Sequence, residues 1–363
     1  MTNLLFAAAA IMLLAAADPV QRNVLLPPAK GNPRNSEAAM IDLADGRIMM
    51  VYSRFTGGRG DHAKANLSSR FSADGGATWT RDDIAITTDD EGGMNTMSPS
   101  LLRMKDGAIG LFYLRKDSLT DCRVFLRVSR DEGKTWREAA ACIEPVGYYV
   151  MNNDRVVRLK GGRILLPVAL HATPAAPEFE PHASIACFYS DDDGKSWRRS
   201  AYVPGGGEHA LEEPGVIELK DGRVMLWVRT DAGKQFVSHS RDGGVTWSDF
   251  APSNIPSPRS PASIKRIAAT GDLLLAWNNN AAGVSQKSPG KRTPFNVAIS
   301  RDEGATWTNV KTLESDPDGW YCYTAIHFSE DHVVLSHCAD NLKKSKALST
   351  TQITRFPVKW LYE

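Results

Sequence analysis

Six segments of the chain share one pattern: a hydrophobic run, a short polar turn and a second hydrophobic run. They are residues 41–55, 102–116, 157–171, 217–231, 264–279 and 326–340. Asp-Gly or a similar turn between apolar runs is a strong local signal for a β-hairpin. Five turns contain a glycine, at Gly46, Gly107, Gly162, Gly222 and Gly271, and the sixth lies near Asp331. We therefore expect six β-hairpins.

A second motif, Ser-x-Asp-x-Gly-x-Thr/Ser-Trp, occurs five times and is called the Asp box below. Its tryptophans are Trp79, Trp136, Trp197, Trp247 and Trp307, at steps of 57, 61, 50 and 60 residues. The aspartate can accept hydrogen bonds from a tight turn, and the glycine takes a positive φ that other residues resist. Repeated units of this length are typical of radially arranged four-stranded sheets. The sequence therefore predicts an all-β, six-bladed β-propeller with five Asp-box turns.

The sixth unit has no Asp box because it contains the C-terminus. We expect its outer strands within residues 348–360, with residues 21–26 as a closing strand. This arrangement makes residues 18–363 a single propeller domain. Residues 1–17 have an apolar stretch followed by small residues at Ala15 to Ala17, which is typical of a secretory signal peptide. We expect cleavage near Ala17, export to the periplasm or the extracellular space, and no membrane span in the mature chain.

Charge and special residues narrow the choice of function. The chain has 43 Lys and Arg against 42 Asp and Glu. This near-equal balance of charges argues against nucleic acid as a partner, because a phosphate-binding surface usually shows as a basic excess. The five cysteines match no zinc pattern, and Cys322 and Cys338 either pair with each other or are buried thiols. The histidines have no metal-ligand spacing, and no glycine-rich phosphate loop is present. We therefore expect neither a metal nor a cofactor.

Polar residues recur at fixed distances from the turn glycines. Nine residues before the glycine stand Glu37, Ser98, Asn153 and Glu213. Seven or eight residues after it stand Arg54, Arg115 and Arg229. In a propeller these positions converge on one mouth of the central axis. Acids and arginines at such a mouth indicate a pocket for an anion or a sugar.

The Asp boxes on six units, together with residues 212–229 (EEPGVIELKDGRVMLWVR), resemble the sialidase (neuraminidase) superfamily of glycoside hydrolases. The resemblance covers nearly all of residues 18–363. It implies that Glu213 is the catalytic glutamate and that Arg229 is the second arginine of a carboxylate-binding triad. It also implies that Arg292, shortly before the fifth Asp box, is the third arginine.

The resemblance further implies that Tyr323 is the nucleophile and that Asp61 is the acid/base residue. In the retaining mechanism of these enzymes, a tyrosine attacks the anomeric carbon. A neutral phenol avoids repulsion from a carboxylate on the substrate. Glu213 would then be the general base for Tyr323, and Asp61 would protonate the leaving oxygen.

The chain departs from the sialidase pattern at one position. Sialidases carry the first triad arginine ten residues before the first turn glycine, where this chain has Ser36 followed by Glu37. Either Arg34 replaces the missing arginine, or the clamp is incomplete and Glu37 repels a substrate carboxylate. In the second case, Arg115 and Asn153 would recognise a different sugar.

We therefore predict a secreted exo-glycosidase that acts on a terminal α-linked sialic acid or a related acidic sugar, with a glycan as its substrate. Two alternatives remain open. One is a glycosidase or lyase that acts on a uronic or deoxy sugar, and the other is a propeller that binds carbohydrate without catalysis.

Overall fold

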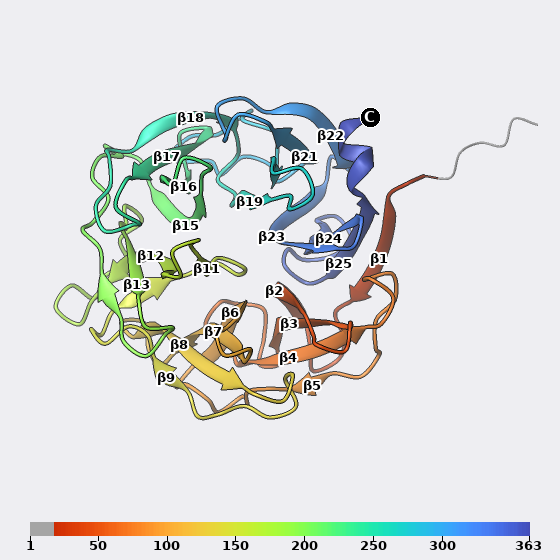
Figure 1. Ribbon diagram of the computed structural model, residues 1–363, viewed down its shortest axis with the longest axis horizontal. Helices are drawn as coiled ribbons and strands as arrows, with labels where there is room; N and C mark the ends of the chain where they lie inside the picture. Colours follow the sequence, from red (N-terminus) through yellow and green to blue (C-terminus); the bar gives the residue numbers. More distant parts are fainter. Residues whose placement is uncertain (1–17) are drawn as a thin grey trace, which may run out of the picture.

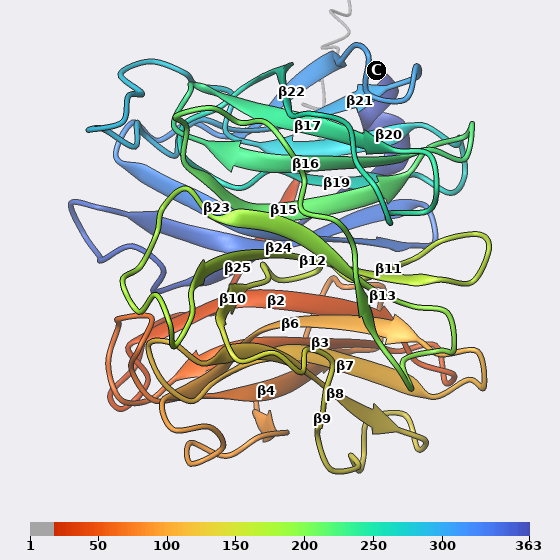
Figure 2. The same ribbon diagram turned by 90° about the vertical axis from the view of Figure 1, so that its left-hand side faces the viewer.

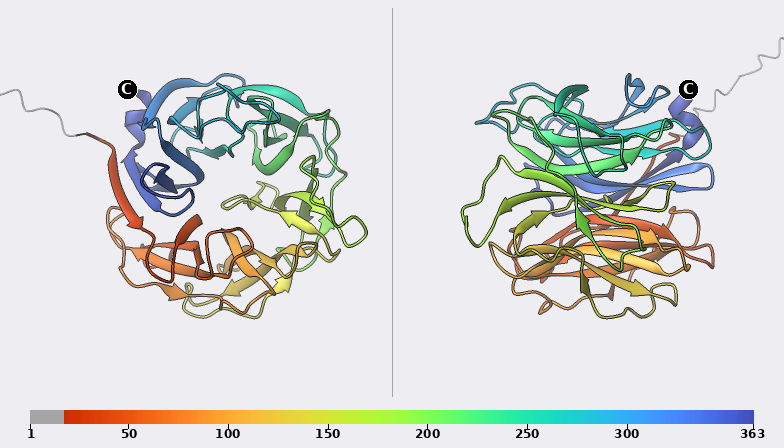
Figure 3. Two further views of the ribbon diagram at one scale, coloured as in Figure 1. Left: turned by 180° about the vertical axis from the view of Figure 1, so that it is seen from behind. Right: turned by 60° about the vertical axis from the view of Figure 1, so that its left-hand side comes forward.

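The computed structural model describes residues 18–363, which form strands β1 to β25 and one short 3-10 helix, Val358–Tyr362. The predicted signal peptide, residues 1–17, lies outside the described residues. The strands form five hydrogen-bonded sheets, which Figure 1 shows placed around a central axis. Figure 3 shows the same ring from behind, and Figure 2 shows it edge-on. In the part of the chain described, no helix has the length and apolarity needed to cross a bilayer.

Four of the five sheets are antiparallel and have four strands each. The first contains β2 (Arg34–Asp42), β3 (Ile48–Phe55), β4 (Ala65–Ser72) and β5 (Ile84–Ala85). Another contains β15 (Leu211–Glu218), β16 (Val224–Thr230), β17 (Lys234–Ser240) and β18 (Ala251–Pro256). The next contains β19 (Ser263–Arg266), β20 (Leu273–Trp277), β21 (Phe295–Ser300) and β22 (Thr308–Glu314). The last contains β23 (Gly319–Ser329), β24 (His332–Asn341), β25 (Thr351–Pro357) and β1 (Gln21–Leu26).

The fifth sheet has nine strands and combines the second and third predicted units. The second unit supplies β6 (Asn95–Arg103), β7 (Ile109–Lys116), β8 (Cys122–Ser129) and β9 (Ala140–Ala141). The third supplies β10 (Tyr148–Val150), β11 (Val157–Arg158), β12 (Ile164–Ala172), β13 (Ser184–Ser190) and β14 (Arg198–Arg199). A parallel bridge between Tyr148 and Cys122 joins the two units. The six units therefore do not form six separate hydrogen-bonded sheets.

All six predicted hairpins are present. They are the antiparallel pairs β2–β3, β6–β7, β11–β12, β15–β16, β19–β20 and β23–β24. Their first strands lie nearest the central axis (Figure 1). The predicted closing strand is confirmed as well, because β1 pairs antiparallel with β25. The N-terminal and C-terminal ends of the described chain thus share one sheet.

Each Asp-box turn is held by the same set of hydrogen bonds. In the fourth copy, Asp242 accepts bonds from the Ser240 hydroxyl (2.7 Å), the Thr246 amide (2.9 Å) and the Thr246 hydroxyl (2.6 Å). The other aspartates, Asp74, Asp131, Asp192 and Asp302, repeat this pattern. The turn chemistry inferred from the sequence is therefore confirmed in all five copies.

The glycine of the Asp box packs against the preceding unit of the ring. A Cβ built on Gly133 would lie 2.7 Å from the Met49 sulfur on β3, and one on Gly76 would lie 2.9 Å from Val334 on β24. The second contact joins the first unit to the last. Because both glycines also have positive φ, 82° and 86°, a larger residue would be strained twice over. The hydrophobic core accordingly lies between neighbouring sheets, as where Tyr52 packs with Val334.

Replacing the turn aspartate should destabilise the fold without touching the site. We expect Asp242→Ala to lower the free energy of unfolding by about 1–3 kcal/mol, because several hydrogen bonds to a charged acceptor are lost. Urea unfolding followed by tryptophan fluorescence measures the change. Asp82→Ala, at another exposed aspartate, is the control and should leave the midpoint unchanged. Equal midpoints for the two variants would contradict the role given to the turn.

Candidate active site

The first and second strands of several units meet at a cavity of about 240 Å³ near the central axis. Five of the ten predicted site residues line it: Glu37, Asp61, Glu213, Arg229 and Tyr323. They come from β2, the loop after β3, β15, β16 and β23. Residues separated by up to 286 positions in the sequence therefore meet in one pocket. Of the inner positions predicted from the turn glycines, Glu37, Ser98, Glu213 and Arg229 converge on this cavity.

The side chains reach this cavity from β-bulges on the inner strands. The register of β2, β6, β15 and β23 shifts at Glu37, Ser98, Glu213 and Tyr323. All four residues have a positive φ, of 49°, 54°, 52° and 56°. This conformation is uncommon for residues other than glycine, and bulges of this kind re-aim side chains next to active sites. Three of the inner positions counted from the turn glycines, Glu37, Ser98 and Glu213, are therefore bulges, and Tyr323 adds a fourth.

Tyr323, Glu213 and Arg229 form a connected chain of hydrogen bonds. The Tyr323 hydroxyl donates to Glu213 Oε1 over 3.0 Å, and Arg229 Nη1 donates to Glu213 Oε2 over 2.7 Å. Burial and the neighbouring Glu213 charge raise the pKa of Tyr323 well above its usual value. At neutral pH the phenol is therefore protonated, and its proton points at a carboxylate.

Glu212 anchors the other side of Arg229. Arg229 Nε donates to Glu212 Oε2 over 2.8 Å, and Arg259 donates to both Glu212 oxygens over 2.9 Å. Burial alone would raise the pKa of Glu212, but Arg229 and Arg259 lower it to about 2. Glu212 is thus ionised at all ordinary pH values, and its charge fixes the orientation of Arg229.

A second network lies on the first unit. The Arg34 guanidinium donates to Asp61 Oδ1 (2.5 Å), Glu37 Oε1 (2.9 Å) and the Ser36 hydroxyl (3.1 Å). Its side chain is only 1% exposed and is not part of the described lining of the cavity. Arg34 therefore does not serve as a free arm of an anion clamp. It holds two carboxylates in place instead, and Glu37 occupies the cavity wall.

Two further predicted residues lie just behind the cavity. The Arg292 guanidinium is 5.6 Å from the centre of the Tyr323 ring and donates to the Arg259 carbonyl over 3.2 Å. Asn153 donates to the carbonyls of Ala38 (2.6 Å) and Tyr323 (3.2 Å), and so ties β2 to β23. Both residues support the site from outside its described lining.

The structure does not place Arg54 and Arg115 with the others. Arg54 lies 3.4 Å from Asp83, and Arg115 donates to Asp117 over 3.0 Å, so both are engaged away from the cavity. The reason is strand parity. Arg54 and Arg115 stand eight residues after their turn glycines, whereas Arg229 stands seven after Gly222. Adjacent residues of a strand point to opposite faces, so the two offsets are not equivalent.

Sequence reasoning missed several residues of the site. Besides Arg259, these are the lining residues Lys116, Tyr148, His171 and Phe179. The Phe179 ring stacks on His171 at 4.3 Å, and it is 55% exposed. Lys116 and His171 both stand nine residues after a turn glycine, a recurrence that the sequence does contain. Phe179 and Arg259 lie in loops that no repeat position predicts.

The five cysteines are buried free thiols. Cys322 and Cys338 are direct partners in the register of β23 and β24. Of the two alternatives left by the sequence, the structure shows the buried thiols. Among the described residues, no group of three or more His, Cys, Asp or Glu side chains is placed to hold a metal ion.

Comparison with known proteins assigns the chain to a family. The model of the BNR repeat-like domain matches residues 46–335. A sialidase of Micromonospora viridifaciens is 26% identical over 333 residues, covering 80% of this chain and 50% of that protein. A sialidase of Vibrio cholerae is 28% identical over 207 residues, covering 48% of this chain and 24% of that protein. The chain thus spans half or less of the length of these relatives.

Solved structures share the fold. A protein of unknown function from Dyadobacter fermentans superposes with a TM-score of 0.74 at 20% identity, covering 93% of this chain and 99% of that one. This likeness shows that the arrangement of sheets is one found in another solved structure. The chain belongs to the BNR repeat-like family of the sialidase superfamily.

The buried ion pairs predict a pH-dependent change in stability. Glu212→Gln removes the negative charge that Arg229 and Arg259 share. The free energy of unfolding should therefore fall by about 3 kcal/mol at pH 7. The pKa of Glu212 is lowered in the folded state, so its contribution is complete above the unfolded value and is lost as the pH falls toward about 2. Urea unfolding at several pH values measures this difference.

The exposed Glu208, replaced by Gln, is the control for this series. The gap in unfolding free energy between the wild type and Glu212→Gln should shrink as the pH is lowered from 5 to 2. A gap that is absent at pH 7, or that does not change with pH, would contradict the assignment.

Proposed function

We propose that the protein is an exo-glycosidase that cleaves a terminal α-linked sialic acid, or a related acidic sugar, with retention through a tyrosine nucleophile. The observation that carries the proposal is the 3.0 Å hydrogen bond from the Tyr323 hydroxyl to the Glu213 carboxylate. We also propose that the nine-stranded sheet counts as two blades, which makes residues 18–363 one six-bladed propeller. The sialidase relatives and the shared fold support both statements.

The first chemical step needs a nucleophile that is uncharged at rest. The raised pKa of Tyr323 keeps the phenol neutral, so an anionic sugar can approach it without repulsion. As the phenol oxygen attacks the anomeric carbon, its proton passes to Glu213. Arg229 holds the accepting carboxylate in place and stabilises the charge that spreads over the pair.

Asp61 is the proposed general acid for the leaving oxygen. Its side chain is 62% exposed at the mouth of the cavity, where the departing group must lie. Desolvation would raise the pKa of Asp61, but the Arg34 guanidinium lowers it below its usual value. Only a small fraction of Asp61 is therefore protonated at neutral pH. The enzyme should work fastest in acid.

The remaining lining fits a sugar. Tyr148, His171 and Phe179 form an aromatic wall, with the Tyr148 and Phe179 rings 5.9 Å apart and edge-on. Apolar ring surfaces combined with a few fixed polar groups are typical of small-ligand pockets. The same cavity presents carboxylates that can accept hydrogen bonds from sugar hydroxyls. A non-catalytic binding protein would not require the Tyr323–Glu213 pair.

Loss of the nucleophile or its base should abolish turnover while binding persists. We expect Tyr323→Phe and Glu213→Gln each to reduce kcat on an α-sialoside by about 10³-fold, within the range found for general-base and nucleophile removal. A fluorogenic aryl α-sialoside and a panel of aryl uronides measure turnover. Proton NMR of the first product identifies its anomeric form and distinguishes hydrolysis from internal transfer.

The control for these variants is Tyr202→Phe, at a tyrosine that is 41% exposed and outside the cavity. Full activity of Tyr323→Phe would overturn the nucleophile assignment. Turnover of uronides but of no sialoside would transfer the proposal to a different acidic sugar. An inverted first product would exclude the tyrosine mechanism.

The role of Asp61 predicts a dependence on the leaving group. We expect Asp61→Asn to lower kcat/KM for a sialyl-lactose substrate by about 10²-fold or more, because its leaving oxygen needs a proton. An aryl sialoside, whose phenolate leaves unaided, should lose much less. In the wild type, kcat/KM for sialyl-lactose should fall as the pH rises, because the lowered pKa of Asp61 leaves less of the acid form. Equal losses on both substrates would argue against general acid catalysis by Asp61.

A further inference from the structure

Lys116 is a buried ammonium in the wall of the cavity, and the proposed mechanism does not use it. Lys116 is the last residue of β7 and is only 2% exposed. Its Nζ donates to the Asp61 carbonyl over 2.6 Å and has only longer contacts with His62 Nδ1 (3.5 Å) and the Met97 sulfur (3.9 Å). Among the described residues, it forms no ion pair with a carboxylate. At least one of its three N–H groups lacks a strong acceptor.

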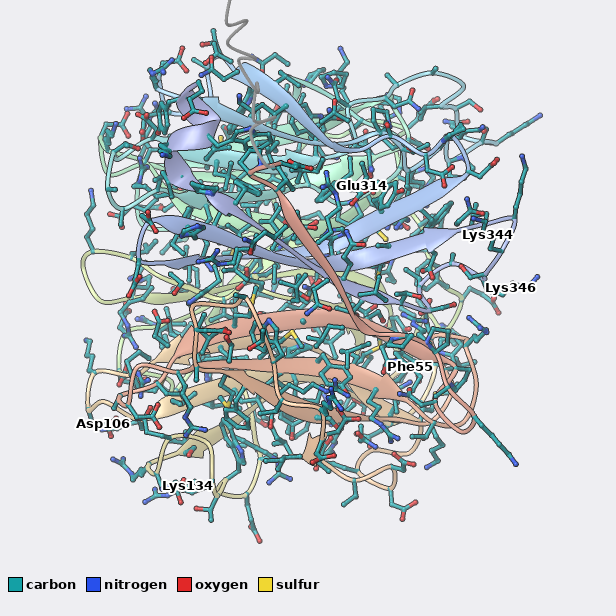
Figure 4. All side chains as sticks on the ribbon, turned by 90° about the vertical axis from the view of Figure 1, so that its right-hand side faces the viewer. Phe55, Asp106, Lys134, Glu314, Lys344 and Lys346 are labelled. Carbon is teal, nitrogen blue, oxygen red and sulfur yellow. The ribbon has the colours of Figure 1, made fainter. Side chains whose placement is uncertain are left out.

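Comparison with the first unit shows that the fold can bury a phenyl ring at this position. The residues nine after the five turn glycines are, in chain order, Phe55, Lys116, His171, Asp231 and Asn280. Phe55, labelled in Figure 4, is fully buried beneath the Arg34 guanidinium, 4.0 Å from its ring centre. Placing an ammonium where the fold accepts a phenyl ring costs desolvation energy. Packing alone therefore does not explain Lys116.

The charges around the cavity are unevenly paired. Arg229 is bonded to Glu212 and Glu213, and the carboxylates of Glu37 and Asp61 are both bonded to Arg34. Lys116 is the remaining cation of the described lining. Its burial is offset by the hydrogen bond to the Asp61 carbonyl and by the Tyr148 ring, whose centre lies 5.2 Å from Nζ. A ligand anion would give it the charged partner that the protein withholds.

The neighbours of Lys116 indicate which ligand could bring that anion. Tyr148 belongs to the aromatic wall that also contains His171 and Phe179. A sugar ring packed on this wall can direct one substituent toward Nζ. Lys116 contacts the Asp61 backbone but lies inside the solvent edge, because it is only 2% exposed. The bound group is therefore part of the sugar in the pocket.

We propose that Lys116 binds an anionic substituent, a carboxylate or a sulfate ester, on the sugar that occupies the cavity. This inference rests on the proposed function insofar as the ligand is a sugar. It gives the second unit a specificity role that Arg115, one residue earlier and on the opposite face, does not have. Lys116 acts in binding and takes no part in proton transfer.

Isothermal titration calorimetry with free monosaccharides tests the proposal. The probes are N-acetylneuraminic acid, its methyl ester, glucuronic acid and glucose 6-sulfate, none of which carries a leaving group. The wild type should bind at least one acid more tightly than the neutral ester. Lys116→Met should weaken binding of that acid about 10- to 100-fold, as expected for a lost charged hydrogen bond, and leave the ester unaffected. The preferred probe distinguishes a carboxylate from a sulfate.

Two variants serve as controls for this experiment. Lys134→Met removes an equal charge at the periphery, where Figure 4 labels Lys134, and should not alter binding. Lys116→Arg keeps the charge and should retain most of the affinity for the acid. If Lys116→Met does not fold, as judged by circular dichroism, Lys116→Gln takes its place.

Wild-type affinity of Lys116→Met or Lys116→Gln for the acid would overturn the proposal, and so would equal binding of acid and ester by the wild type. These outcomes are separate from failure of the proposed function. If Tyr323→Phe and Glu213→Gln remained active, the nucleophile assignment would fail whatever Lys116 binds. If both were inactive while the Lys116 variants bound acid normally, only the specificity role would fail.

Discussion

A repeated distortion of the backbone positions the side chains that line the central cavity. Inner strands of four units carry a bulge at which a residue other than glycine adopts a positive φ. Such a conformation costs of order 1–3 kcal/mol and persists only when its surroundings enforce it. The surroundings here are the hairpin partner on one side and the packed neighbouring sheet on the other. The result is that Glu37, Glu213 and Tyr323 all project into one cavity from separate sheets.

The cavity can hold so many carboxylates because each is bonded to a buried arginine. Arg34 serves Glu37 and Asp61, and Arg229 serves Glu212 and Glu213. The two arrangements lie in different units and resemble each other, with one arginine joining two acids. Paired in this way, the acids keep fixed positions, and the proposed nucleophile Tyr323 stays protonated until substrate binds.

Much of the fold could be predicted because its signals are local and repeated. The turn glycines and Asp boxes predicted the hairpins. The absence of a sixth box predicted the closing strand, which is β1. The union of two units into one sheet depends on the bridge between Tyr148 and Cys122, which no local pattern encodes. In the site, Glu37 and Glu213 could be located by counting from a turn glycine, whereas Tyr323 came only from the sialidase resemblance because the sixth turn has no glycine. The second strands required the correct parity, and an offset wrong by one residue selected Arg115 in place of Lys116.

The proposed mechanism requires that Tyr323 bond covalently to the anomeric carbon during turnover. The most direct measurement is peptide mass spectrometry of the protein after incubation with 2,3-difluorosialic acid, in which the fluorine beside the anomeric centre slows release of the sugar. We expect one added sugar on the peptide that contains Tyr323, and no adduct on Glu213→Gln protein. An adduct on a different residue, or sialoside turnover without any covalent intermediate, would contradict it.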